Sequence, residues 1–195
     1  KVVTWNVRRA KRSSDVWKIL LKVNPDIATL QEVGDLPEEV VSNYQLLSKT
    51  PRRKDGGEQR FTTVILTKGE LDSSVRLRGD AEWVNKEATY YDGNIIYCRT
   101  KMDDNQVFHV VSVYSPAWHI PKERLAGTDI SSIKLDNNQD LYLTEIMWSL
   151  LKNAKISDAS NWIVGGDLNS SVTFDSWGAT PRGNQEIIDR MDALG

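Results

Sequence analysis

Residues 162–171 read WIVGGDLNSS, an apolar run that ends in two glycines and then a carboxylate and an amide two positions apart. The apolar run predicts a strand. Because residues i and i+2 of an extended chain share a face, Asp167 and Asn169 are expected to point together at the strand's carboxyl end. Gly165 and Gly166 would let backbone or a ligand approach closely. The same residue types are the usual turn formers, so the motif alone is equally compatible with a simple turn.

The start of the chain predicts a strand, a helix and a second strand. Residues 2–7 and 27–30 are rich in β-branched and apolar side chains, as strands are. The intervening helix is expected to start at a cap on Ser13 or Ser14 and to stop at Asn24-Pro25. Its apolar face is expected to consist of Val16, Ile19, Leu20 and Val23.

A right-handed crossover would place these two strands in one sheet, with their carboxyl ends at the same edge. Asn6 and Glu32 are expected to meet there. Further along, residues 51–59 (PRRKDGGEQ) read as a loop, and helices are expected at residues 138–153 and 186–194, with Asp189 and Asp192 on the polar face of the latter. Additional, largely antiparallel strands are expected at residues 61–67, 83–88, 94–100 and 107–114.

The amino-acid composition limits which kinds of protein this chain can be. The 195 residues, with 39% hydrophobic and 27% charged side chains, suit one globular domain, and no apolar run approaches the roughly 20 residues of a membrane span. A single cysteine, Cys98, allows no intramolecular disulfide, so a cytoplasmic location is expected. The net charge of −2 argues against a broad basic surface, and the clusters at residues 8–12 and 52–54 are read as solvated faces. A chain that lacks an initial Met and ends at Gly195 is interpreted as trimmed or partial, and a removed signal peptide stays possible.

Three other segments put a polar residue at the end of a predicted strand, as residues 162–171 do: Thr4-Trp5-Asn6, Leu30-Gln31-Glu32 and Val113-Tyr114-Ser115-Pro116. In the order and spacing of these four segments the chain resembles the endonuclease/exonuclease/phosphatase superfamily, which includes deoxyribonuclease I, apurinic/apyrimidinic endonucleases, sphingomyelinases and inositol-polyphosphate phosphatases. The resemblance implies an α+β fold, a four-layer α/β/β/α sandwich like deoxyribonuclease I. It covers residues 1–195 as one domain and leaves out the family's last strands and its terminal Ser-Asp-His motif.

The resemblance also implies roles for the strand-end residues. Glu32 would bind Mg²⁺ or Mn²⁺, with Asn6 supporting the metal site and its hydrogen bonds, and Mg²⁺ accepts one carboxylate with waters and neutral partners. Asp167 would position or deprotonate the attacking water, and Asn169 would orient water and phosphate. Tyr114 stands where related enzymes carry a tyrosine or a histidine, and its phenol would donate to a phosphate oxygen, although a tyrosine in this place can also serve packing.

Several nearby residues have weaker assignments. Trp118 would stack on a base or sugar or else cover the core, His119 would reach a substrate or stay solvated, and Arg60 would meet a substrate phosphate. His109 lies inside a predicted strand and is expected to be structural. Ala117 replaces an asparagine of the apurinic/apyrimidinic endonucleases, which argues against specificity for abasic sites.

The function expected from the sequence is Mg²⁺-dependent phosphodiester hydrolysis, by an endonuclease or exonuclease acting on nucleic acid, which the basic residues after Asn6 and the tyrosine at Tyr114 favour. The alternatives are a phosphatase or lipid phosphodiesterase of the same superfamily, with a phosphorylated small molecule or lipid as substrate, or a binding domain that has lost catalysis. Without a Ser-Asp-His segment the 195-residue form is expected to be impaired. Its open sheet edges are expected to be covered by further chain or by a second copy in a homo-oligomer.

Overall fold

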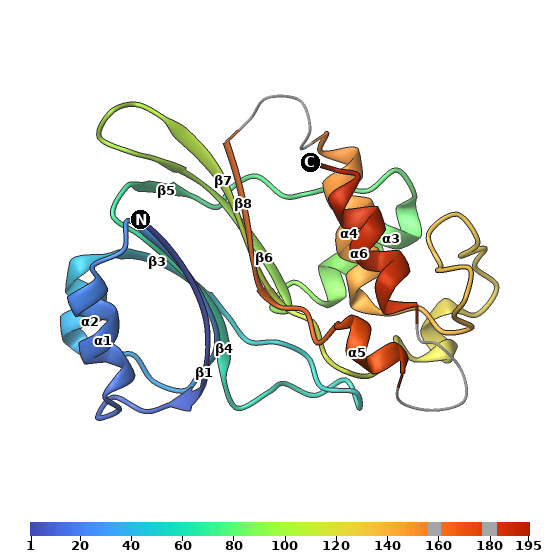
Figure 1. The fold of residues 1–195 in the computed structure, drawn as a ribbon, viewed down its shortest axis with the longest axis horizontal. Helices are drawn as coiled ribbons and strands as arrows, with labels where there is room; N and C mark the ends of the chain where they lie inside the picture. The colour runs from blue at the N-terminus through green and yellow to red at the C-terminus, as the bar shows by residue number, and fades with distance from the viewer. Residues whose placement is uncertain (156–160, 177–182) are drawn as a thin grey trace. The chain divides into compact units, whose positions relative to one another are not determined.

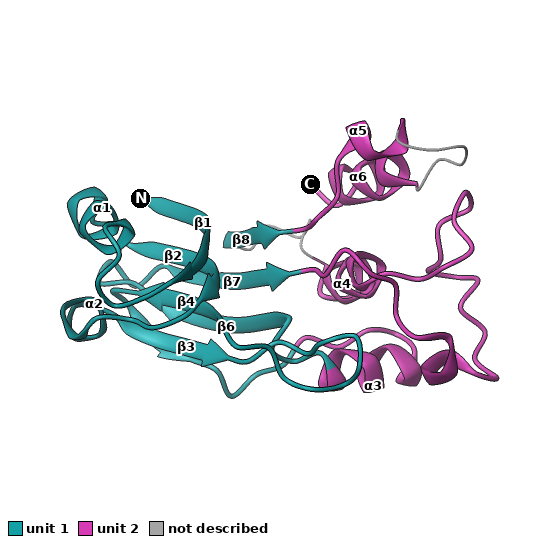
Figure 2. Cartoon of the chain, turned by 90° about the horizontal axis from the view of Figure 1, so that it is seen from below, with its two compact units in different colours: residues 1–76, 91–114, 160–167 teal, residues 77–90, 115–159, 168–195 magenta. Residues whose placement is uncertain are grey.

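The computed structural model describes residues 1–155, 161–176 and 183–195. The chain divides into two units (Figure 2): residues 1–76, 91–114 and 160–167 form unit 1, and residues 77–90, 115–159 and 168–195 form unit 2. Unit 1 contains the sheets, and unit 2 contains the long loop after residue 114 and the helices after residue 76. Figure 1 shows these elements along the chain.

Unit 1 contains two four-stranded sheets, with strand orders β1-β2-β4-β3 and β5-β6-β7-β8. Parallel pairs join β1 to β2 and β7 to β8, and the other neighbours are antiparallel. The parallel β1–β2 unit and the largely antiparallel middle of the chain are thus confirmed, whereas the short strands β3 and β5 were not predicted. The strands are β1 (Val2–Ala10), β2 (Ile27–Val33), β3 (Gln45–Lys49), β4 (Thr62–Thr67), β5 (Glu70–Asp72), β6 (Ile95–Lys101), β7 (Val107–Tyr114) and β8 (Asn161–Asp167).

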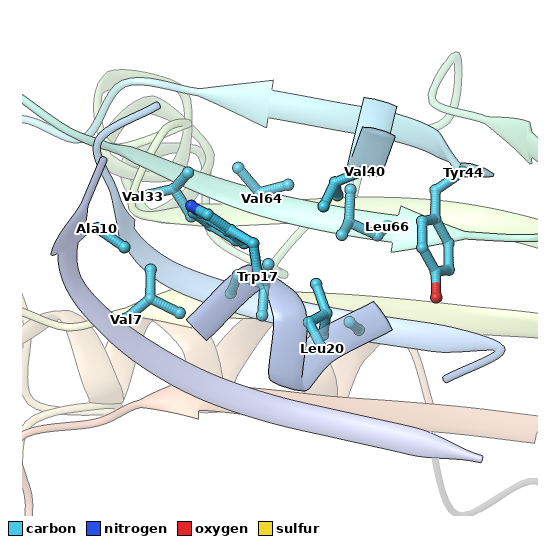
Figure 3. Packing of buried hydrophobic residues seen from close by; sticks show 11 residues of the cluster. Val7, Ala10, Trp17, Leu20, Val33, Val40, Tyr44, Val64 and Leu66 are labelled. Carbon is cyan, nitrogen blue, oxygen red and sulfur yellow. The ribbon is translucent and has the colours of Figure 1, made fainter. Parts of the chain in front are cut away.

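The first sheet packs against helix α1 (Val16–Val23), with α2 (Glu38–Asn43) beside it. Figure 3 shows Trp17 and Leu20 of α1 among the side chains of this core. The predicted apolar face of α1 is therefore partly wrong, because Ile19 and Val23 are 50% and 39% exposed whereas Trp17 and Leu20 are buried. The core of this layer comprises Val7, Ala10, Trp17, Leu20, Ala28, Leu30, Val33, Val40, Tyr44, Val64 and Leu66.

The C-terminal end of α1 was predicted correctly, whereas its N-terminal cap was not. Asn24 ends the helix in the left-handed region, with φ 50°, as an asparagine can. The predicted cap on Ser13 or Ser14 is wrong, because the N-cap is Asp15. The Ser14 hydroxyl instead accepts a hydrogen bond from the Lys11 backbone N–H, at 3.0 Å, and so closes the preceding turn.

The two sheets of unit 1 meet through a second core of Ile27, Ile65, Ile96, Cys98 and Val110. Burial raises the pKa of the Cys98 thiol to about 12, so Cys98 behaves as a small apolar side chain. Inside this interface Gln31 of β2 donates to the Ser112 hydroxyl of β7 at 3.0 Å, which fixes the sheets relative to each other near the ends of those strands. Burying a polar group is tolerable only when it is hydrogen-bonded in this way.

Unit 2 consists of the helices α3 (Glu82–Tyr90), α4 (Leu143–Asn153), α5 (Val172–Asp175) and α6 (Asn184–Asp192) and the 3₁₀ turn η1 (Lys122–Leu125). The predicted strand at residues 83–88 is wrong, because this segment lies in α3. Val84 and Glu87, three residues apart, form the buried side of that helix. Arg124 donates two hydrogen bonds to Glu87, at 2.8 and 2.9 Å, so a tertiary ion pair lets a charged residue occupy the buried face.

Helix α4 is shorter than its pattern suggested, and α6 lies two residues before its predicted range of 186–194. Helix α4 begins at Leu143, five residues after the predicted start at residue 138. Glu145 accepts a hydrogen bond from the Tyr142 backbone N–H at 3.1 Å and so defines this start as a capping box does. In α6, Asp189 and Asp192 are exposed, as predicted. Within the part of the chain that the structure describes, no helix has the length and apolar character to cross a membrane.

Candidate active site

Three strands of unit 1 carry predicted polar residues at or next to their carboxyl ends, whereas β1 continues to Ala10 and carries Asn6 just before its bulge. Tyr114 is the last residue of β7 and is paired in register with Asp167, the last residue of the parallel strand β8. On the other sheet, Asn6 of β1 is paired with Gln31 of β2, directly before Glu32. Because both pairs are parallel, their ends share an edge, and hydrogen bonds link Asn6, Glu32 and Asp167 across the two sheets.

The side-chain amide of Asn6 bridges the two carboxylates. Its Nδ2 donates to Glu32 Oε1 at 3.2 Å and to Asp167 Oδ2 at 2.7 Å. Its Oδ1 accepts the Arg8 backbone N–H at 2.9 Å, which sets the orientation of the amide. Two carboxylates that share a site repel each other, and an amide that donates to both lowers that cost.

Glu32 lies in an irregular part of the sheet. Between the pairs Asn6–Gln31 and Ala10–Val33, residues 7, 8 and 9 of β1 face the single residue Glu32. Glu32 adopts φ 53°, a left-handed conformation that is uncommon for a residue with a side chain. Bulges of this kind re-aim side chains and are frequent beside active sites, and here the bulge directs the carboxylate to Asn6.

Gly34 makes this bulge possible. A Cβ atom at Gly34 would lie 2.7 Å from the carbonyl oxygen of Ala10, closer than side chains are found to pack. The glycine therefore lets the chain after β2 lie close against the backbone at the end of β1. The Asp35 backbone N–H donates to the same Ala10 carbonyl at 3.0 Å and holds the two segments together.

Tyr114 is held through its backbone and its ring. The buried Asn94 donates from Nδ2 to the Tyr114 carbonyl at 3.1 Å, and the Tyr114 N–H donates to the Asn94 carbonyl at 2.8 Å. The ring meets Phe61 edge to face, with centroids 5.0 Å apart. Burial, and then the charges of Glu32 and Asp167, raise the pKa of Tyr114. The phenol is consequently protonated at neutral pH and can donate a hydrogen bond.

The donor atoms of this cluster suit a hydrated divalent cation better than a fully ligated one. Within residues 1–155, 161–176 and 183–195 there is no group of three or more His, Cys, Asp or Glu side chains placed to hold a metal ion. Mg²⁺ keeps several waters and takes one or two carboxylates, so the bridged pair Glu32 and Asp167 fits this ion. Asn6 fits less well as a direct ligand, since its oxygen already accepts the Arg8 N–H.

Asn169 belongs to unit 2, and its conformation differs from the prediction. Strand β8 ends at Asp167, and Asn169 has φ 47°, so residues 167–169 are not continuous extended chain. The argument that Asp167 and Asn169 share a face of one strand is therefore wrong. The Asn169 Nδ2 donates to the Ser115 carbonyl at 2.7 Å and ties this turn to the segment after β7.

Asn169 also lines a pocket of about 170 Å³ within unit 2. The wall of the pocket includes Tyr142, Phe174 and the fully buried Glu145. Glu145 Oε2 accepts from the Tyr142 N–H at 3.1 Å and from the Thr144 hydroxyl at 3.0 Å, whereas its Oε1 has no partner among the described residues. Burial raises the pKa of Glu145 to about 7.

The remaining predicted residues lie in several places. Arg60 is an exposed residue of unit 1, next to the buried Phe61. Trp118 and His119 are half-buried residues of unit 2, where His119 Nδ1 bonds to the Ile120 carbonyl at 3.0 Å. Ala117 lines the pocket. His109 lies inside β7, where its Nδ1 bonds to the Tyr97 hydroxyl at 2.8 Å, so its structural placement is as predicted.

Four residues near the strand ends were given no role of their own in the prediction: Arg9, Gln31, Phe61 and Asn94. Arg9 Nε lies 3.8 Å from Glu32 Oε2, and its guanidinium carbon is 5.4 Å from the centre of the Phe61 ring. Gln31 and Asn94 are buried amides, a residue type that is mostly exposed, but burial is not visible in a sequence.

The fold of unit 1 and its strand-end cluster define a deoxyribonuclease I-like protein, which confirms the α+β fold class expected from the sequence. The chain belongs to the Endonuclease/Exonuclease/phosphatase family, whose model matches residues 3–190. This family comprises nucleases and phosphatases, which act on phosphate esters. A comparison with curated proteins gave no significant match.

Solved structures with a similar fold are distant in sequence. The endonuclease domain of TRAS1, a telomere-specific non-LTR retrotransposon, matches with a TM-score of 0.55 and 16% identity over 100% of this chain and 70% of that one. The 3′ phosphatase NExo from Neisseria, bound to product DNA hairpin, matches with a TM-score of 0.54 and 13% identity over 99% and 70% of the two chains. An endonuclease/exonuclease/phosphatase family protein from Leptotrichia buccalis matches with a TM-score of 0.52 and 13% identity over 100% and 72%.

Proposed function

We propose that this protein is a Mg²⁺- or Mn²⁺-dependent phosphodiester hydrolase that acts on nucleic acid. The observation that carries the proposal is the amide of Asn6, which holds together Glu32 near the end of β2 and Asp167 at the end of β8. A scaffold that only binds a partner has no evident need to collect two carboxylates at this cost. That two of the similar structures are named a retrotransposon endonuclease and a DNA-bound 3′ phosphatase favours nucleic acid as the substrate.

In the proposed mechanism Glu32 would hold the metal ion, and Asp167 would hold the attacking water and accept its proton. The ion, when bound, would neutralise charge on the phosphate and on the leaving oxygen. Asn6 keeps both carboxylates in position through its two N–H donors. Tyr114, protonated because of its raised pKa, donates to a phosphate oxygen. The role of Asn169 in orienting water and phosphate rests on its sequence motif, and substrate contacts of Arg60, Trp118 and His119 remain predictions.

Nicking of supercoiled plasmid in Mg²⁺ tests the proposal directly. We expect Glu32→Gln and Asp167→Asn to lower the nicking rate at least about 100-fold, because one removes charge from the metal site and the other removes the base. Excess EDTA should abolish the activity. The matched control is Asp189→Asn, which makes the same acid-to-amide change at an exposed position of α6 and should keep the wild-type rate.

The same preparations should be offered inositol phosphates, a sphingomyelin vesicle and a 3′-phosphorylated oligonucleotide. Phosphate release from the oligonucleotide without nicking would make the protein a 3′ phosphatase, and turnover of inositol phosphate or lipid alone would overturn the assignment to nucleic acid. Nicking that survives EDTA or either substitution would reject the mechanism.

A further inference from the structure

Arg9 places a positive charge against the carboxylate that the proposed function assigns to the metal ion. Its Nε lies 3.8 Å from Glu32 Oε2, the oxygen that Asn6 does not contact. The Arg9 side chain is 65% exposed, whereas that of Glu32 is 22% exposed. The guanidinium thus approaches the site from the solvent side and has access both to Glu32 and to an incoming anion.

The backbone holds Arg9 in this place. Arg8 and Arg9 both adopt left-handed conformations, with φ 49° and 59°, inside the bulge that faces Glu32. The bulge is anchored before Arg9 by the hydrogen bond from the Arg8 N–H to Asn6, and after it by the bond from the Asp35 N–H to Ala10. A left-handed conformation in two successive residues with side chains is unfavourable, so the surrounding contacts must maintain it.

The side chain of Arg9, in contrast, is only loosely held. At 3.8 Å the contact with Glu32 is at the long end of an ion pair, and exposed pairs of this kind contribute little to stability. The centre of the Phe61 ring lies 5.4 Å from the guanidinium carbon, so the side chain also has a cation–π contact there. The side chain can therefore leave Glu32 at little cost while its backbone stays fixed.

We propose that Arg9 couples metal binding to phosphate binding, an inference that rests on the proposed function. Without a divalent ion, Arg9 neutralises Glu32. When Glu32 is engaged by the ion, like charges repel the guanidinium, which turns along the Phe61 ring toward solvent and binds a substrate phosphate oxygen. Arg9 is thus a competitor for Glu32 in the free protein and a phosphate contact in the loaded one.

Two thermodynamic consequences distinguish this role from that of an ordinary surface arginine. Removing the charge of Arg9 should tighten metal binding, because the ion no longer displaces a cation. Phosphate should also tighten metal binding in the wild-type protein, because it offers Arg9 another partner. Since the coupling between two binding sites is reciprocal, the metal ion should tighten phosphate binding by the same factor.

Mn²⁺ binding followed by electron paramagnetic resonance tests the first consequence without any measurement of turnover. We expect Arg9→Ala to lower the Mn²⁺ dissociation constant roughly 3- to 10-fold, as expected for one unit charge a few ångströms away in screened solvent. Arg9→Lys keeps the charge and should stay within about twofold of wild type. The matched control is Arg8→Ala, which removes the same charge from the same bulge and affects Mn²⁺ affinity only by relieving long-range repulsion, so the shift should stay below about twofold.

The second consequence is tested with a phosphorothioate-linked dinucleotide as the phosphate probe. The dinucleotide should lower the Mn²⁺ dissociation constant of wild type and of Arg8→Ala several-fold more than that of Arg9→Ala, in which only the direct attraction between the ion and the phosphate remains. Melting temperatures of all variants, measured without Mn²⁺, verify that each one folds.

The outcomes separate this inference from the proposed function. If Glu32→Gln binds Mn²⁺ as tightly as wild type, the metal site itself is misassigned. If Glu32→Gln loses Mn²⁺ but Arg9→Ala binds it no more tightly than Arg8→Ala, the competition is overturned and the metal site stands. Equal tightening by Arg9→Lys and Arg9→Ala would also overturn the inference, because charge would not be the cause.

Discussion

At the scale of single residues, Asn6 shows how a neutral side chain can organise charged ones. An aspartate at this position would add a third negative charge, and an apolar residue would leave Glu32 and Asp167 without a shared donor. The amide supplies two N–H donors in one plane, and its oxygen is held by the backbone of the neighbouring bulge. The orientation of the carboxylates thus depends on the same bulge that presents Arg9.

Glu145 yields a pH prediction at the same scale. Burial raises its pKa from the ordinary 4.5 to about 7, so the folded protein binds its proton more tightly than the unfolded chain does. The stabilisation from this proton is fully present below about pH 4.5 and is lost as the pH rises through about 7. Relative to Glu145→Gln, the wild-type free energy of unfolding should fall by roughly 3 kcal/mol between pH 4.5 and pH 8.

Urea unfolding of the two proteins at several pH values measures this difference directly. The glutamine variant serves as the control for every other titrating group, because only residue 145 differs. Parallel pH curves for the wild type and the variant would show that the Glu145 carboxyl titrates normally in the folded state.

At the scale of elements, strand β8, which ends at Asp167, is tightly packed at its two glycines. A Cβ atom at Gly165 would lie 2.5 Å from the Thr29 hydroxyl of β2, and one at Gly166 would lie 2.1 Å from the Val113 carbonyl of β7. The two glycines therefore let β8 lie close to β7 in its own sheet and to the facing sheet of β1 and β2. This close approach places Asp167 within hydrogen-bonding distance of Asn6.

We expect Gly166→Ala to destabilise the protein by at least about 2 kcal/mol, because backbone must move to admit the methyl group. Asp167 would be displaced with it, so activity should fall even in the folded fraction. Gly57→Ala is the matched control, since its added Cβ would meet a flexible side chain, Asp55, at 3.2 Å, and its cost should stay within about 0.5 kcal/mol. Thermal unfolding measures the stability of both variants. Equal stability of the two would contradict the tight packing of β8 at Gly166.

At the scale of the whole molecule, the charge balance limits how nucleic acid can be bound. The chain carries 25 Lys and Arg against 27 Asp and Glu, and some of its basic residues form a cluster at residues 8–12. A protein of this composition lacks the broad positive surface that gives strong sequence-independent attraction. Recognition should then depend on a few phosphate contacts, Arg9 among them.

The salt dependence of binding tests this limit. For a short duplex in Ca²⁺, the logarithm of the association constant should fall with the logarithm of the salt concentration with a slope of about −2 to −4, since each phosphate contact contributes about −0.9. Fluorescence anisotropy over a range of NaCl concentrations measures the slope. A slope steeper than about −6 would mean that many more basic residues contact the DNA.

The amino-acid sequence by itself determined the family and most strand ends. Strands follow from local periodicity, so Glu32, Tyr114 and Asp167 could be assigned to the ends of strands without a structure, whereas the end expected near Asn6 is wrong because β1 continues to Ala10. The family model then agrees with the resemblance carried by those four segments.

Only the tertiary structure decided how these ends meet. The bulge at Glu32, the turn at Asn169 and the contact of Arg9 depend on segments far apart in the chain, and no local pattern encodes them. Helix α3 was misread for the same reason, because Glu87 is buried by an ion pair with a residue 37 positions away. Periodicity reports which face of an element is apolar, whereas hydrogen bonds and charges between distant segments decide which polar residues are buried together.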